Sequence, residues 1–188
     1  MGQELVFETR GNVEILSQKK IAIFASRATP QEFYPRALTL FNRLAQQDVA
    51  IASGWQAPLE KFLFKKGVGL QIRANIIKYL PRDLNCYQLS YTEQVLLDEN
   101  KLLLVAPDTD VRRPEKKWIN RRDALLFSQI NHVLFLYIVP GGRLESYFNQ
   151  LLNRDYHVYL PEDAQNSFLN ASGVIKLNEQ NVAELLGV

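Results

Sequence analysis

The sequence of 188 residues contains little cysteine and little histidine. It has one cysteine, Cys86, which excludes an internal disulfide framework and a zinc site built from cysteines. Its two histidines, His132 and His157, are too few for a histidine-rich metal centre, so we expect no metal and no cofactor. The formal net charge is only +2, and the charge of the whole chain therefore does not by itself indicate a nucleic-acid partner.

Long apolar runs are also missing. No run approaches the roughly 18 residues that a membrane-spanning helix needs, so we expect no membrane partner. Residues 1–10 lack a basic start followed by an apolar core, which predicts no secretory signal and a cytoplasmic protein. No repeat, low-complexity tract or linker is visible. With 47% apolar and 22% charged residues, the composition is that of a globular protein, and the length suits one α/β domain.

What the sequence does contain is a series of short, unbroken apolar runs that end in turns. Such runs are typical of strands buried on both faces of a parallel sheet. They alternate with segments whose apolar residues recur at helical spacing. This alternation predicts a Rossmann-like, three-layer α/β/α fold with a mostly parallel sheet. Strands are expected at residues 21–25, 49–52, 68–72, 102–106, 133–139, 157–160 and 174–177.

Helices are expected at residues 30–44, 58–67, 76–80, 91–97, 121–130, 143–152 and 179–186. The short segment 76–80 is assigned to a helix that stops before Pro81, and residues 108–120 are expected to be polar and irregular. We expect residues 1–188 to form a single domain. It would comprise a lead-in hairpin or extended segment at 1–18, a core at about 20–162, and a C-terminal strand and helix at 173–187.

Several predicted strands end in residues that suit an anion. In an open parallel sheet, ligands bind outside the carboxyl ends of the strands. At Pro140-Gly141-Gly142 a strand passes directly into a helix, whose free N–H groups and positive dipole end favour a phosphate. The alternative is that these glycines only provide a tight connection. The candidate nucleotide- or phosphate-binding residues are Ser26, Arg27, Ser53, Gly54, Arg73, Arg121, Arg122, Gly141, Gly142 and Arg143.

A basic run lies beside these turns. Between Arg112 and Arg122 there are six Lys or Arg residues and one acid, a local excess of +5 in a chain of net charge +2. An aromatic ring among cations is typical of surfaces that stack the bases of single strands. The candidate nucleic-acid-binding residues are Arg112, Arg113, Lys116, Lys117 and Trp118. The alternative is a solvated loop with the tryptophan packed beneath it.

Three segments, in this order, resemble motifs of the DNA-processing protein A (Smf) family. Residues 21–27 resemble its strand ending in Gly-Ser-Arg, and residues 49–54 resemble its strand ending in Ser-Gly. Residues 122–126, with Asn131, resemble its Arg-Asn-Arg-Ile-Ile helix and the Ser-Asp before the next strand.

The chain departs from this family at Ala25, where the family has glycine, and at residues 55–59, where the family has Ala-Arg-Gly-Ile-Asp. The resemblance covers roughly residues 20–162. It implies a Rossmann-like fold and binding of single-stranded DNA, in DNA uptake or recombination, by a module without enzymatic activity.

Residues 140–145 also resemble the Pro-Gly-Gly-x-Gly-Thr-x-x-Glu motif of the Lonely Guy enzymes, which release a base from a nucleoside monophosphate. The Gly-Thr is absent and Glu145 stands three residues earlier than the family's glutamate. If chemistry exists, this resemblance implies that Arg121 or Arg122 anchors the phosphate and that Glu145 stabilises positive charge on the ribose.

The expected partner is therefore single-stranded DNA or a nucleotide, and a homodimer is a further option. The sequence favours a binding protein over an enzyme. Two alternatives stay open: a sensor of a small nucleotide, and a Lonely Guy-type phosphoribohydrolase.

Overall fold

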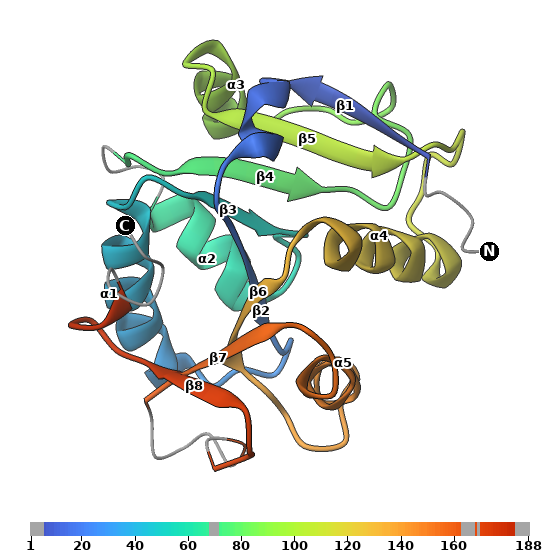
Figure 1. The fold of residues 1–188 in the computed structure, drawn as a ribbon. Helices are drawn as coiled ribbons and strands as arrows, with labels where there is room; N and C mark the ends of the chain where they lie inside the picture. The colour runs from blue at the N-terminus through green and yellow to red at the C-terminus, as the bar shows by residue number, and fades with distance from the viewer. Residues whose placement is uncertain (1–5, 68–71, 163–167, 169, 183–188) are drawn as a thin grey trace.

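The computed structural model describes residues 6–67, 72–162, 168 and 170–182. Within these residues the strands form one sheet of eight, in the order β1-β5-β4-β3-β2-β6-β7-β8. Each neighbouring pair is parallel except β1 and β5, which are antiparallel. Helices cover both faces of the sheet (Figure 1). The predicted three-layer fold with a mostly parallel sheet is confirmed.

The chain builds the sheet outward from β2 in two directions. It first passes through β3 and β4 to β5, and then returns to the other side of β2 with β6, β7 and β8. The strand order therefore reverses at β2, and the carboxyl ends of β2 and β6 border a topological switch point. The strands are β1 (Phe7–Gly11), β2 (Lys20–Ala25), β3 (Ala50–Ser53), β4 (Asn75–Tyr79), β5 (Leu102–Pro107), β6 (His132–Tyr137), β7 (His157–Pro161) and β8 (Val174–Leu177).

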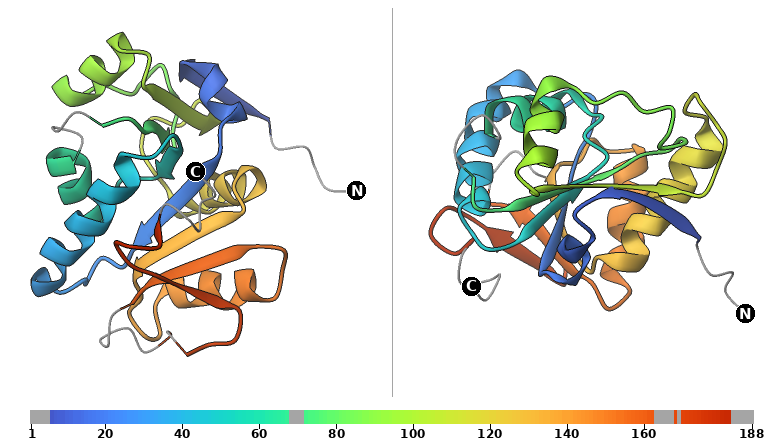
Figure 2. Two further views of the ribbon diagram at one scale, coloured as in Figure 1. Left: turned by 60° about the vertical axis from the view of Figure 1, so that its left-hand side comes forward. Right: turned by 90° about the horizontal axis from the view of Figure 1, so that it is seen from above.

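The helices divide between the two faces, as Figure 2 shows from above. One face carries α1 (Tyr34–Ala45), α2 (Pro58–Gly67) and α3 (Tyr91–Asp98), and the other carries α4 (Lys116–Gln129) and α5 (Arg143–Leu152). The short 3-10 helices η1 (Val13–Ser17) and η2 (Gln31–Phe33) precede β2 and α1. Apolar residues at helical spacing turn toward the sheet, for example Leu144, Phe148 and Leu151 of α5, which are all buried.

One predicted helix is wrong. Residues 76–80, assigned to a helix, lie in strand β4, while the strand expected at 68–72 falls largely outside the described residues. Lys78 interrupts the apolar run of β4 and hid the strand pattern. In the structure Lys78 is buried and its Nζ lies 2.6 Å from Oε1 of Glu93 on α3, so the charge is paired inside the core.

One other boundary differs from the prediction. Helix α4 begins at Lys116, so the second part of the segment expected to be irregular is helical. Of the two alternatives for residues 1–18, the described part has an extended strand rather than a hairpin, because β1 pairs with β5 and the following residues form η1. Gly11 makes this turn with φ +114, and a Cβ there would lie 2.2 Å from the Leu102 carbonyl oxygen.

No helix among the described residues is long and apolar enough to cross a bilayer. The same part of the chain holds no group of three or more His, Cys, Asp or Glu side chains that could bind a metal. The closing helix predicted at 179–186 lies largely outside the described residues, and the single domain over 1–188 stays a prediction.

Candidate functional site

A pocket of about 640 Å³ opens at the carboxyl ends of the strands, at the switch point beside β2. We call it the strand-end pocket. Segments that follow β2, β3, β4 and β6 line it together with α4. Arg27, Gly54, Arg122, Gly142 and Arg143, which lie far apart in the sequence, all meet there. The structure therefore brings together most of the turns that the strand pattern placed at one edge.

Arg122 forms part of the wall of the pocket. Its side chain is only 4% exposed, and its Nε and Nη2 donate to Oδ1 of Asp123 at 2.8 and 2.5 Å. Gly54 faces the guanidinium, since a Cβ on Gly54 would lie 2.2 Å from Nη1. Among the described residues Nη1 has no hydrogen-bond acceptor, which leaves one donor group beside the pocket.

Asp123 connects two arginines. It is 1% exposed, and while Oδ1 accepts from Arg122, its Oδ2 lies 3.1 Å from Nη1 of Arg143. The hydroxyl of Tyr147 donates to the same Oδ2 at 3.0 Å. Burial, and then the Asp123 carboxylate, raise the pKa of Tyr147 to about 12, so the phenol stays protonated and keeps this bond. Two cations and one carboxylate leave an excess positive charge, held in fixed positions.

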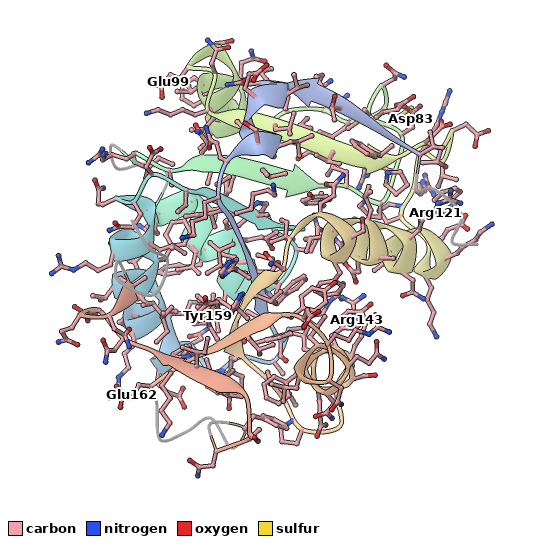
Figure 3. All side chains as sticks on the ribbon, in the orientation of Figure 1. Asp83, Glu99, Arg121, Arg143, Tyr159 and Glu162 are labelled. Atoms are coloured by element: carbon pink, nitrogen blue, oxygen red, sulfur yellow. The ribbon has the colours of Figure 1, made fainter. Side chains whose placement is uncertain are left out.

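Arg143 is 51% exposed and reaches from the first residue of α5 into the pocket. Its guanidinium also lies over the Tyr147 ring, 5.6 Å from the centroid. Figure 3 shows Arg143 and Arg121 on the side of the molecule where α5 and α4 begin. A cation at the start of a helix opposes the helix dipole, so Arg143 is poorly placed as a purely structural residue.

Glu60, which the sequence pattern did not indicate as a site residue, is 5% exposed and lines the pocket. Its carboxylate accepts from the N–H groups of Ala25 at 3.0 Å, Gln56 at 2.8 Å and Ala57 at 3.2 Å. Burial raises its pKa, against the opposing effect of these hydrogen bonds and of Arg122. Glu60 thus joins the end of β2 to the turn after β3. The signal in the sequence was a glutamate in the first helical turn, two positions after Pro58.

Arg82 was not predicted as a site residue, because the strand that precedes it, β4, was assigned to a helix. It follows β4 and lines the pocket, and its guanidinium lies over the Tyr87 ring at 5.9 Å from the centroid. Its Nε is buried without a hydrogen-bond partner. With Arg82, the described part of the lining contains four arginines and one carboxylate, that of Glu60. The lining is therefore electropositive.

The two predicted serines hold the turns in shape. Ser26 Oγ accepts from the Val139 N–H at 3.0 Å, which fastens the end of β2 to the segment after β6. Ser53 is fully buried, and its Oγ accepts from the Trp55 N–H at 3.1 Å. Trp55 itself has φ 52, in the left-handed region. Both hydroxyls thus have partners within the protein.

The glycine turn before α5 uses two of its own N–H groups. Gly141, with φ +74, donates its N–H to the carboxylate of Glu145, and Gly142 donates to the Val139 carbonyl at 3.1 Å. Glu145 is not among the residues that line the strand-end pocket. The N–H groups that stay free for a ligand are those of the first helical turn, from Arg143 onward.

The basic run flanks the pocket. Its cationic residues before the helix are exposed, and the run reaches the pocket wall at Pro114, Ile119 and Arg122. Trp118 is half-buried, with Lys117 Nζ at 5.4 Å and the Arg121 guanidinium at 5.5 Å from its ring centroid. These contacts are consistent with either of the two interpretations of the tryptophan. Arg112, Arg113, Lys116 and Lys117 are all exposed.

The predicted position of Arg73 is wrong. The sequence placed it after a strand, at the carboxyl edge, whereas it lies just before β4, and its N–H donates to the Ala45 carbonyl at the end of α1. Arg73 is therefore at the amino edge of the sheet, opposite the strand-end pocket. The error follows directly from the misassigned strand.

No protein-family model and no curated protein matches the sequence. Solved structures of similar fold include DNA processing protein A from Streptococcus pneumoniae, with a TM-score of 0.72 and 15% identity. The match covers 95% of this chain but 65% of that one. DNA processing protein A from Helicobacter pylori gives a TM-score of 0.75 and 16% identity, over 96% of this chain and 86% of that one.

The Moco carrier protein of Chlamydomonas is also similar in structure, with a TM-score of 0.56 and 13% identity over 90% of this chain and 96% of that one. At these identities the comparisons concern the fold. They confirm the resemblance at that level: the chain has the Rossmann-like fold of DNA processing protein A.

Proposed function

We propose that the protein binds single-stranded DNA through its phosphates, in the strand-end pocket. The observation that carries the proposal is the convergence of four arginines, from four separate segments, on one pocket. Arginine binds phosphate through paired N–H groups in a fixed plane, and it stays charged at any working pH.

The arrangement is prepared before a ligand arrives. Asp123 fixes Arg122 and Arg143 in position, and Glu60 fixes the turns that carry Arg27 and Gly54. Because these groups are already ordered, binding a phosphate costs little side-chain entropy. The free N–H groups at the start of α5 add a second kind of donor.

The exposed cations beside the pocket favour a strand over a small nucleotide. A volume of about 640 Å³ would hold a nucleotide, and this supports the nucleotide sensor as the alternative. A strand would also reach Arg112, Arg113, Lys116 and Lys117, which a mononucleotide in the pocket would not need. The similar Helicobacter pylori structure is described by its single-stranded DNA binding mode, which adds support from outside the chain. A place in DNA uptake or recombination is part of this proposal.

We propose binding rather than hydrolysis. Glu60, the one carboxylate in the described lining, accepts three backbone hydrogen bonds. Glu145, which the Lonely Guy resemblance would assign to the ribose, caps Gly141 instead. Both carboxylates are thus held by backbone N–H groups and Glu145 lies outside the described pocket lining, which argues against stabilisation of a ribosyl cation. Incubation with AMP tests this point, since release of free adenine would contradict it.

Fluorescence anisotropy with a labelled oligothymidylate tests the main proposal. The Arg27→Ala variant should weaken binding about tenfold or more, because Arg27 is exposed and its loss removes a phosphate contact rather than a structural one. Lys65→Ala on α2 is the matched control, since it removes the same charge from an exposed site away from the pocket. Equal losses in both variants would contradict a defined site.

A competition experiment separates the two ligands. Unlabelled thymidine monophosphate should displace the oligonucleotide only at much higher concentration than an unlabelled strand of the same base. If the mononucleotide competes equally well per molecule, the pocket is a nucleotide site and the strand proposal is wrong.

A further inference from the structure

A second groove, of about 700 Å³, runs between α4 and α5. We call it the α4–α5 groove. Lys116 and Arg143 line one end, at the first residues of the two helices, and Arg154 lines the other end, just beyond α5. Arg143 also lines the strand-end pocket, so the two hollows meet at this residue. The Arg143 guanidinium can therefore contact a ligand in either hollow.

The groove is positively charged at both ends. Its described lining contains Lys116, Arg143 and Arg154 and no carboxylate. Arg154 is exposed and forms no ion pair with the described residues, and Lys116, like Arg143, opposes the dipole of the helix that it begins. Arg143 is paired with Asp123 behind the wall, but no described carboxylate lines the groove itself, so its surface is complementary to a polyanion.

Three aromatic rings, from Phe127, Tyr147 and Tyr156, form part of the wall. The Tyr156 hydroxyl donates to the Phe127 carbonyl at 2.7 Å, and the Tyr147 hydroxyl is held by Asp123. Phe127 packs edge-on against Tyr147, with centroids 5.2 Å apart. Because the rings are half-buried and held in place, they form an aromatic wall that needs no further ordering.

We propose that a single strand with one phosphate in the strand-end pocket passes Arg143 and continues along the α4–α5 groove, with bases against the aromatic wall and a phosphate at Arg154. This inference rests on the proposed function. Helix α5 has ten residues and is about 15 Å long, room for about four stacked nucleotides at about 3.4 Å each.

The test compares oligothymidylates of two lengths, about 3 and about 12 nucleotides. The Arg154→Glu variant should bind the short strand as the wild type does, since the pocket alone holds it. It should lose about tenfold in affinity for the long strand, and the slope of log affinity against log salt should fall by about one. Lys65→Glu on α2 is the matched charge reversal and should leave both strands bound with little change.

The outcomes separate the two proposals. A long strand bound equally well by wild type and Arg154→Glu, while Arg27→Ala still weakens binding, overturns the groove and leaves the pocket in place. A wild type that binds neither strand overturns both. A loss for the short strand as well as the long one also overturns the groove path, because the short strand would then depend on Arg154. Thermal melting of each variant checks that the exposed substitutions leave the fold intact.

Discussion

The Arg122 guanidinium occupies the space in which any residue other than glycine at position 54 would place its Cβ, 2.2 Å from Nη1. The two residues come from different segments, the turn after β3 and the middle of α4. The absence of a side chain at Gly54 leaves room for the Arg122 guanidinium. The glycine predicted to bind phosphate would therefore act by letting an arginine reach the pocket. The backbone of Gly54 and the side chain of Arg122 form one wall.

Gly54→Ala should therefore push Arg122 out of place. We expect the free energy of unfolding to fall by about 1–3 kcal/mol, as for other overpacked sites, and affinity for single-stranded DNA to fall with it. Chemical denaturation and anisotropy measure the two effects. Gly173→Ala, at φ +88 in the turn before β8, is the control: it should lose some stability through backbone strain but keep its affinity.

Asp123→Asn should weaken binding even though it makes the chain more positive. Removing one partner of a buried ion pair lowers the free energy of unfolding by about 3–5 kcal/mol. The substitution also removes the carboxylate that holds Arg122 and Arg143 in position. If net charge alone governed binding, the variant would bind DNA more tightly, so tighter binding would contradict the account. Asp48→Asn, an exposed change of the same charge away from both hollows, is the control.

The same variant should change the titration of a tyrosine. Because Asp123 is one cause of the raised pKa of Tyr147, after burial, its loss should bring that pKa down from about 12. Ultraviolet difference titration of the variant against the wild type follows the phenol. An unchanged titration would mean that Asp123 and Tyr147 do not interact in solution.

His132 should make stability depend on pH. Burial, and then His157 and Lys19, lower its pKa from 6.5 to about 4. The unfolded chain therefore takes up this proton first, so the contribution is fully present above pH 6.5 and is lost as the pH falls toward 4.

The His132→Phe variant keeps the ring and removes the titrating group. As the pH falls from 6.5 to 4, the free energy of unfolding should decrease in both proteins. The decrease should be about 1–2 kcal/mol smaller in the variant, after allowance for solvent screening of a half-exposed group. Denaturation at several pH values measures the difference. Identical pH profiles for the two proteins would contradict the lowered pKa.

The fold was largely predictable because buried parallel strands are apolar on both faces. Strands β2, β5 and β6 stand out in the sequence for that reason. Strand β4 did not, since Lys78 lies inside it and is neutralised by Glu93, which is fifteen residues away. A charge whose partner is distant in the sequence cannot be recognised as paired from the local pattern. Because residues 76–80 were assigned to a helix, Arg73 was placed at the wrong edge of the sheet and Arg82 was not recognised as following a strand.

The site was predictable in part. Turns after parallel strands must lie at one edge, so the meeting of Arg27, Gly54 and Gly142 followed from the strand pattern. The roles of Glu60 and Asp123 did not follow, because a carboxylate that fixes loops or arginines looks in sequence like any other helical acid. Their hydrogen-bond partners come from several segments, and only the three-dimensional structure reveals them.

Salt dependence of single-stranded DNA binding tests the central claim most directly. Affinity is measured at several salt concentrations. For the wild type, log affinity should decline linearly with log salt. For the Arg27→Ala/Arg143→Ala double variant, the slope of this line should be shallower by about two. A salt-independent affinity in the wild type, or the same slope in both proteins, would contradict phosphate binding at the strand-end pocket.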